Sequence, residues 1–229
     1  MGLGSVGRRN ALTASAITCL VAGMARIAIM VGPKGRGSNM MAIARACASG
    51  EIDAEIATVI APNETSAAVA SAREAGLLVD IVPPGEDYGD RLLGALCPNS
   101  DLICLAGYLR LLPLEVLRAF PRRILNIHPA LLPRHGGKGM YGHHVHEAVL
   151  AAGDTESGAS VHYVTENYDE GEVILRRCCP VLPGDTPDTL AARVLVEEHV
   201  AYIEAIRIVL SGMPERSDRS DPDGSGHGR

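Results

Sequence analysis

The chain has 229 residues, of which 47% are hydrophobic, and this length supports one well-formed core in a single domain. One Phe and no Trp leave Ala, Val, Ile and Leu to build that core, which favours an α/β sheet buried on both faces. The formal net charge of −6 and the lack of a long basic run exclude an extended nucleic-acid surface.

Residues 1–24 differ from the rest of the chain. Arg8 and Arg9 precede an apolar run over 11–25, and no acidic residue stands before Glu51. This composition resembles a secretory signal or an organelle transit peptide, although Ser and Thr interrupt the run. The segment is too short and too polar to span a membrane. We expect it to be a disordered N-terminal extension or the product of an upstream start codon.

From Arg26 onward, strand patterns alternate with helix patterns. Short apolar runs bounded by Gly, Pro or polar residues predict strands, and longer segments with helical periodicity predict helices. In chain order we expect strand 27–31, helix 40–48, strand 54–61, helix 65–75, strand 78–82, helix 87–96, strand 101–106, helix 113–119 with Pro113 at its first position, and strand 123–127. This alternation is typical of βαβ units and a mainly parallel sheet.

The last part of the chain departs from that alternation. The predicted elements there are helix 143–152, extended segments 158–164 and 172–182, and a long amphipathic helix 186–210 that Asp185 caps and Gly212 ends. The short loop between the two extended segments indicates antiparallel neighbours. We therefore predict an α/β fold: a Rossmann-like open twisted sheet, mostly parallel with an antiparallel part, and helices on both faces.

The composition of the flanking segments indicates the limits of the domain, and the cysteines indicate its compartment. We expect a single domain over 25–212, followed by a disordered polar tail over 213–229 that is rich in Ser, Asp, Gly and Arg. The six cysteines contain no Cys-x-x-Cys pair and lie in apolar surroundings. This pattern predicts reduced, packed thiols in a cytoplasmic protein.

A glycine-rich loop, Gly35-Arg36-Gly37-Ser38-Asn39, joins the first predicted strand to the first helix. Glycines there let backbone amides approach an anion, and a helix N-terminus adds positive potential. The loop matches neither the dinucleotide fingerprint, since position 40 is Met, nor a Walker loop. It indicates either a phosphate-monoester site, which Lys34 and Arg36 favour slightly, or a turn that only closes a strand–helix corner.

The stretch from Ile124 to Pro133 carries the strongest chemical signal. Apolar and polar residues alternate up to a turn bracketed by Pro129 and Pro133, which is typical of a strand end. Asn126 and His128 are two residues apart, so both emerge on the same face. An amide that can donate to an oxyanion, beside an imidazole that titrates near neutral pH, suits acyl transfer. The alternative is a buried pair that only holds the loop together.

Three further polar residues are candidates with a structural alternative each. Asp169 lies in the loop between the last two extended segments, at the sheet edge where ligands gather. We expect it to meet His128 and to raise the pKa of that imidazole; the alternative is a solvated acid. His162 either faces the site or is hydrogen-bonded in the core. Glu198, on the last helix, either holds a substrate ammonium group or is solvated.

Four histidines, at positions 135, 143, 144 and 146, suggest a metal at first sight. No Cys or carboxylate stands at a convincing ligand spacing, and His143 and His146 share a helix face without a third partner. We therefore expect no metal.

These weak signals occur in an order that one family shares. Gly-x-Gly-Ser-Asn is followed by Ala-Gly-Tyr-Leu-Arg-Leu-Leu, then by Asn-Ile-His-Pro-Ala-Leu-Leu-Pro, then by Ser-Val-His-Tyr-Val-Thr-Glu-x-x-Asp-x-Gly. Over about residues 26–212 the chain resembles the phosphoribosylglycinamide formyltransferase family. The central motif with a downstream Asp is specific for folate-dependent formyl transfer, and the glycine loop and the late Glu-His pair narrow the resemblance to this family.

The resemblance implies an activity and its catalytic residues. The formyl group of 10-formyltetrahydrofolate would pass to the amine of 5′-phosphoribosylglycinamide in de novo purine biosynthesis, without a metal. His128 would be the general acid, Asn126 would stabilise the oxyanion, and Asp169 would keep His128 in a useful protonation state and organise a proton-relaying water. His162 would support them.

The resemblance also implies the binding residues and the partners. Gly37, Ser38 and Asn39 would bind the ribonucleotide phosphate, and Glu198 the glycine ammonium group. The folate pocket would be lined by Leu109, Arg110, Leu111 and Leu112, with Asn126 at its reactive end. Both partners would be small-molecule substrates, with no nucleic acid and no membrane, and the protein would be a monomer or a homodimer.

The chain departs from the family pattern at three places. The phosphate loop carries an apparent two-residue insertion around Pro33 and Lys34. The segment 136–141 is longer than in shorter members, and we expect it to form a mobile flap over the site. The Arg that often precedes the helix at Tyr88 and reaches folate or substrate has no counterpart in 84–87, so that contact is not assigned.

Three rival interpretations remain at this point. A formyltetrahydrofolate deformylase would share Asn126, His128 and Asp169, but it normally adds an N-terminal regulatory domain that 1–24 cannot supply. A methionyl-tRNA formyltransferase would need a basic C-terminal domain where this chain has a short acidic tail. A non-catalytic ligand-binding domain would explain the glycine loop but not the three polar residues together. The deformylase is the main alternative.

Overall fold

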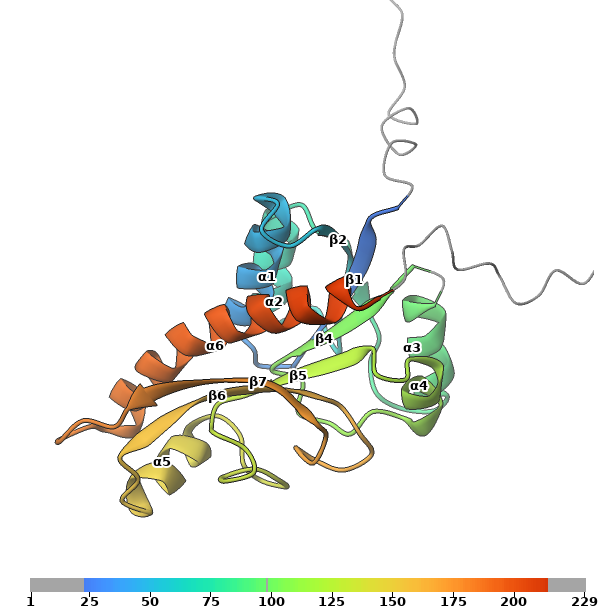
Figure 1. Ribbon diagram of the computed structural model, residues 1–229. Helices are drawn as coiled ribbons and strands as arrows, with labels where there is room; N and C mark the ends of the chain where they lie inside the picture. Colours follow the sequence, from blue (N-terminus) through green and yellow to red (C-terminus); the bar gives the residue numbers. More distant parts are fainter. Residues whose placement is uncertain (1–22, 98, 214–229) are drawn as a thin grey trace, which may run out of the picture. The chain divides into compact units, whose positions relative to one another are not determined.

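The computed structural model describes residues 23–97 and 99–213. Within them, a compact unit from Ala25 to Met213 alternates strands and helices (Figure 1). Its elements are β1 (Ala25–Val31), α1 (Ser38–Ala48), β2 (Ala54–Ala61), α2 (Ala67–Glu74), β3 (Val79–Ile81), α3 (Tyr88–Leu96), β4 (Leu102–Ala106), α4 (Leu114–Ala119), β5 (Ile124–His128), α5 (His143–Ala151), β6 (Glu156–Tyr163), β7 (Val173–Pro180) and α6 (Pro187–Ser211). The predicted N-terminal extension and C-terminal tail lie almost wholly outside the described residues.

One seven-stranded sheet organises the unit, with strand order β3-β2-β1-β4-β5-β6-β7. The pairs from β3 to β5 are parallel, whereas β6 pairs antiparallel with both β5 and β7. Crossover helices make the first part parallel, and the short β6–β7 connection forces the last pair to be antiparallel. The predicted mixed α/β sheet is confirmed.

Two predictions about the first residues of helices are wrong. Pro113 stands at the N-cap of α4 instead of its first helical position. Thr186, not Asp185, caps α6: its side chain accepts from the backbone N–H of Thr189, and the Thr189 hydroxyl accepts from the Thr186 N–H. Asp185 instead accepts from the Leu182 N–H and the Thr189 hydroxyl and forms an ion pair with Arg193. The other predicted elements match the observed ones within about two residues at each end.

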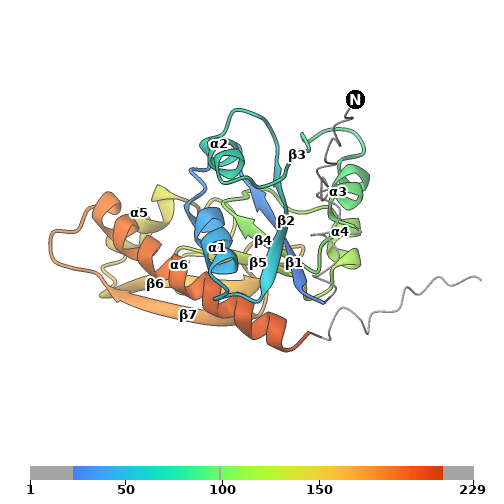
Figure 2. The same cartoon turned by 90° about the horizontal axis from the view of Figure 1, so that it is seen from above.

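Helices cover both faces of the sheet, as Figures 1 and 2 show. Alternate residues of β1 serve the two faces: Ile27 and Ile29 pack under α1, α2 and α6, whereas Ala28 and Met30 pack under α3 and α4. Each fully buried aliphatic side chain of this size contributes about 1.5–3 kcal/mol. The small helix α5 packs through Val149 against α6 and β7.

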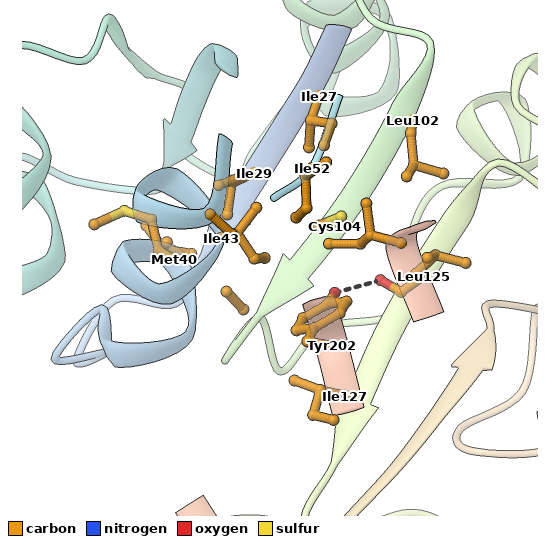
Figure 3. Close-up of a cluster of buried hydrophobic side chains, with 14 of the residues drawn as sticks. Ile27, Ile29, Met40, Ile43, Ile52, Leu102, Cys104, Leu125, Ile127 and Tyr202 are labelled. Atoms are coloured by element: carbon orange, nitrogen blue, oxygen red, sulfur yellow. Dashed lines mark hydrogen bonds between the residues drawn. The ribbon is translucent and has the colours of Figure 1, made fainter. Parts of the chain in front are cut away.

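A buried tyrosine ties the last helix to the two strands that carry the site. The hydroxyl of Tyr202, on α6, lies 3.0 Å from the carbonyl oxygens of both Leu105 on β4 and Leu125 on β5. Figure 3 shows the ring within the aliphatic core and its bond to Leu125. A hydroxyl has one proton, so it donates to one of these carbonyls at a time. The contact holds α6 against the adjacent strands β4 and β5.

The strand order reverses between β1 and β4, and ligands bind at the carboxyl edge of such a switch point. The loops that leave the two strands touch there: a Cβ on Gly32 would overlap the carbonyl oxygen of Gly107. Glycine at position 32 is therefore required by space. The site is expected at this edge.

Candidate active site

A cavity of about 480 Å³ lies at the carboxyl edge, between the ends of β4 and β5, the loops that follow β4, β5 and β6, and α6. Most of the site residues expected from the sequence line it: Asn39, Leu109, Arg110, Leu111, Leu112, Asn126, His128, His162, Asp169 and Glu198. The structure therefore brings together residues that are up to 159 positions apart in the chain. Gly37 and Ser38 are not among the lining residues.

The antiparallel pairing of β5 with β6 places Asn126 directly opposite His162. Nδ1 of His162 lies 2.9 Å from the Tyr163 carbonyl oxygen and must donate to it, because a carbonyl only accepts. In the neutral ring, Nε2 is then free to accept from the Asn126 amide nitrogen at 3.1 Å. His162 is 2% exposed, and it orients the amide that faces the cavity.

Both ring nitrogens of His128 face an oxygen atom. Nε2 lies 2.8 Å from the carbonyl oxygen of His135 and donates to it, so this nitrogen keeps its proton. Nδ1 lies 3.4 Å from a carboxylate oxygen of Asp169. Since the Nε2 proton is engaged, Nδ1 is the nitrogen that can take up and release a proton.

The expected rise in the pKa of His128 is wrong. Burial favours the neutral ring and lowers its pKa, and this effect outweighs the raising effects of Asp169 and of the His135 carbonyl. The ring is 3% exposed, which the sequence does not reveal. His128 is therefore mainly neutral at pH 7.

Asp169 lies between two histidines and the chain after β5. One oxygen accepts from the backbone N–H of Gly137 at 2.9 Å, and the other lies 3.5 Å from Nε2 of His162. Burial raises the pKa of Asp169, but the neighbouring His162 and His128 rings and the hydrogen bond from the Gly137 N–H hold it below its usual value. Asp169 is a carboxylate at neutral pH.

A buried serine fixes the turn after β5. Ser160, which faces His128 across the β5–β6 pair, is fully buried. Its hydroxyl donates to the Ala130 carbonyl at 2.7 Å and accepts from the Leu132 N–H at 3.0 Å. These two bonds satisfy backbone groups that the Pro-bracketed turn leaves without a strand partner.

Glu198 and Asn39 form the second polar group of the cavity. The Asn39 amide nitrogen donates to Glu198 at 2.6 Å. Burial raises the pKa of Glu198 to about 7, against the lowering effect of that bond. The side-chain oxygen of Asn39 is buried without a hydrogen-bond partner in the described part of the chain. A donor from a ligand, such as an ammonium group, would satisfy both residues.

In the glycine-rich loop, the structure explains one glycine by its backbone conformation and places a later residue in the cavity. Gly37 caps α1 with φ of 80°, a conformation that favours glycine, and a Cβ there would lie 3.1 Å from Ala68. This explains the glycine without a ligand. Asn39, two residues later, does line the cavity, whereas Lys34 and Arg36 are exposed. Phosphate binding by Gly37, Ser38 and Asn39 stays a prediction.

The segment 137–142 lines the cavity, at the position expected for the flap. Tyr108, Thr165, Asn167 and Tyr168 line it too, and these four were missed in the sequence. Their only signal is their place in loops at the carboxyl ends of strands. Leu109 and Leu111 are 50% and 47% exposed, so the cavity has an apolar rim suited to an aromatic ligand.

Among residues 23–97 and 99–213, no group of three or more His, Cys, Asp or Glu side chains is placed to hold a metal ion. His143 pairs with Asp188 at 2.9 Å, and His144 with Glu147 at 3.2 Å. In the same part of the chain, no helix is both long and apolar enough to cross a membrane.

The five cysteines of the described residues are free thiols; Cys19 lies outside them. Cys104 and Cys179 are buried, but Cys97 and Cys178 are exposed, so the expectation that all are packed is wrong for these two.

Comparisons with known proteins agree with this geometry. The formyl transferase family matches residues 25–206. The chain is 37% identical over 213 residues to the chloroplastic phosphoribosylglycinamide formyltransferase of Arabidopsis thaliana. The aligned region covers 86% of this chain and 72% of that relative.

Solved structures give the same result. Glycinamide ribonucleotide transformylase 1 from Symbiobacterium toebii is similar with a TM-score of 0.76 and 38% identity, over 82% of this chain and 89% of that chain. A formyltetrahydrofolate deformylase from Pseudomonas syringae pv. tomato has a TM-score of 0.72 at 22% identity, over 82% of this chain and 62% of its own. The second likeness shows the fold alone.

Proposed function

This chain belongs to the formyl transferase family, and we propose that Asn126, His128 and Asp169 carry out its chemistry. It is an enzyme that transfers the formyl group of 10-formyltetrahydrofolate to the amine of 5′-phosphoribosylglycinamide, in de novo purine biosynthesis. The resemblance seen in the motifs is thereby confirmed. The observation that carries the residue assignment is one cluster on the wall of a cavity of about 480 Å³, formed by the buried His128 and His162 with the partly buried Asn126 and Asp169.

Asn126 supports the first step. The neutral substrate amine attacks the formyl carbon, and the electrons of the carbonyl π bond move onto its oxygen. An amide N–H that is already oriented stabilises the oxyanion without reorganisation at the moment of reaction. His162 supplies that orientation, because its Nε2 accepts one of the Asn126 protons.

His128 and Asp169 support the proton transfer. The attacking amine must lose a proton, and N10 of the folate must gain one before the carbon–N10 bond breaks. A neutral His128 accepts a proton at Nδ1, directly or through water, and then acts as the general acid toward N10. The Asp169 carboxylate stabilises the intermediate imidazolium, at 3.4 Å from Nδ1.

Glu198 and Asn39 hold the amine end of the ribonucleotide. A carboxyl group with a pKa raised to about 7 can accept the proton of an arriving ammonium group, which leaves the amine neutral for attack. The unpartnered oxygen of Asn39 accepts a second N–H. Gly37, Ser38 and Asn39, at the N-terminus of α1, bind the phosphate.

The folate lies against the cavity wall formed by Leu109, Arg110, Leu111 and Leu112. Exposed leucines suit its ring systems, and the guanidinium of Arg110 suits its carboxylates. This arrangement directs the N10-formyl group toward Asn126.

The test is an assay of tetrahydrofolate release with and without 5′-phosphoribosylglycinamide. We expect release only when the amine is present, and His128→Ala should abolish turnover while folate binding survives. Release that does not depend on the amine would instead support the deformylase, whose fold this chain shares.

The proposal also includes the domain boundaries, the compartment and the oligomeric state of the protein. The catalytic domain spans 25–212, and the protein acts in the cytoplasm as a monomer or homodimer. Deleting residues 1–23 should leave activity intact, and light scattering of the purified chain gives the oligomeric state. Loss of folding in the truncated chain would contradict these boundaries.

A further inference from the structure

A second polar cluster lies outside the substrate cavity. Asp154, just after α5, accepts a 2.7 Å hydrogen bond from Nε2 of His135 and also pairs with Arg134. The His135 and Asp154 side chains are 15% and 9% exposed. They line a separate cavity of about 250 Å³, and the mechanism above assigns them no contact with substrate.

The backbone of His135 is unusual. Its φ is 54°, in the left-handed region, which costs about 1–2 kcal/mol for a residue with a side chain. The carbonyl of this residue is the acceptor for Nε2 of His128, at 2.8 Å. The direction of a carbonyl follows from the backbone conformation, so the contact that holds His135 also holds the acceptor of His128.

Backbone hydrogen bonds hold Asp154 in position for its contact with His135. Its backbone N–H donates to the Val149 carbonyl at 3.3 Å, and the preceding Gly153 donates to Leu150 at 3.1 Å. Val149 is buried in the cluster that joins α5 to α6. A chain of bonded groups therefore runs from the end of α5 through Asp154 and His135 to His128.

We propose that His135 and Asp154 are positioning residues that select the tautomer of His128. Asp169 faces Nδ1 and favours a proton there, whereas the His135 carbonyl favours the proton on Nε2. The remaining charged or titratable groups near the ring are His162 and His146, on β6 and α5. When the hydrogen bond to Asp154 holds His135 in place, Nδ1 of the neutral His128 ring stays free to accept a proton. This inference rests on the proposed role of His128.

The test compares Asp154→Ala and His135→Asn with a matched control. Asn tolerates the left-handed backbone but is too short to replace the imidazole as a partner of Asp154. Asp188→Ala is the control, because Asp188 also pairs with a histidine, His143, but at the surface. The measurements are kcat, both KM values, and the tautomer of His128 by 15N NMR of histidine-labelled protein, assigned with His128→Gln.

In both test variants we expect kcat to fall about tenfold or more, KM to stay within about twofold, and the Nδ1–H tautomer of His128 to increase. The control should match the wild type. A kcat within twofold of wild type, or a loss of kcat with the Nε2–H tautomer intact, would overturn the inference. If Asp154→Ala does not fold, His135→Asn decides. The NMR measurement needs no substrate, so an inactive wild-type chain would count against the proposed function alone.

Discussion

Replacing Glu198 with Gln separates the stability of this enzyme from its substrate binding. Gln keeps the shape of the side chain and an oxygen that can accept from Asn39, now 2.6 Å from the carboxylate, but it removes the titratable group. Burial raises the pKa of Glu198 from 4.5 to about 7. The substitution therefore removes the cost of a buried negative charge.

The sign and size of the change in stability follow from the difference between the pKa of Glu198 in the folded protein and in the unfolded chain. The folded protein binds the Glu198 proton more tightly than the unfolded chain, so stability falls as pH rises from about 4.5 to about 7. At about 1.4 kcal/mol for each tenfold change in proton affinity, the difference between 4.5 and about 7 corresponds to a loss of at most about 3.5 kcal/mol. We expect Glu198→Gln to be more stable than wild type by up to this amount at pH 8, and by little at pH 5.

Urea unfolding at pH 8 and pH 5 measures the stability, and steady-state kinetics measure the KM for 5′-phosphoribosylglycinamide. That KM should rise about tenfold or more, because the carboxylate that binds the arriving ammonium group and accepts its proton is lost. Glu197→Gln is the control: Glu197 pairs with Arg177 near the surface and should change stability by less than about 1 kcal/mol. Equal unfolding free energies of wild type and Glu198→Gln at pH 8, or an unchanged KM, would refute the reasoning.

Three other substitutions test separate parts of the structure. Asn126→Ala should lower kcat by about 10²–10³ while folate binding, followed by calorimetry, persists; a smaller loss would remove Asn126 from oxyanion stabilisation. Burial lowers the pKa of His146 to about 4, so the unfolded chain binds that proton preferentially and stability falls as pH drops from about 6.5 to 4. His146→Leu should flatten this acid dependence of the unfolding free energy, and an unchanged slope would contradict it. Tyr202→Phe should cost about 1–2 kcal/mol in urea unfolding, since a buried carbonyl loses its donor; equal stability would show that the bond is dispensable.

Periodicity predicted much of the fold because it reports local geometry. The alternation in β5 and the spacing of Asn126 and His128 required one face for both side chains, and both line the cavity. The chain order of strands and helices likewise predicted the parallel part of the sheet.

What the sequence did not predict depends on contacts between distant segments. The pairing of Asn126 with His162 requires the β5–β6 register, which no local pattern encodes. The lowered pKa of His128 follows from burial by several elements at once. The bond between His135 and Asp154 joins two loops 19 positions apart and has no motif. These features are set by tertiary packing.

The contact between Gly32 and Gly107 has a consequence for laboratory evolution of this enzyme. No side chain fits at position 32 unless the two loops separate, so variation there would disturb both strands beneath the cavity. At Gly137, Gly139 and Gly142, nothing lies within 4 Å of an added Cβ, and only the backbone conformation restrains substitution. A library that seeks new acceptor amines is best placed on the rim and on 138–141, with glycine kept at position 142, where φ of 56° and ψ of −132° lie outside the left-handed region that Asn and Asp tolerate, and with position 32 kept fixed.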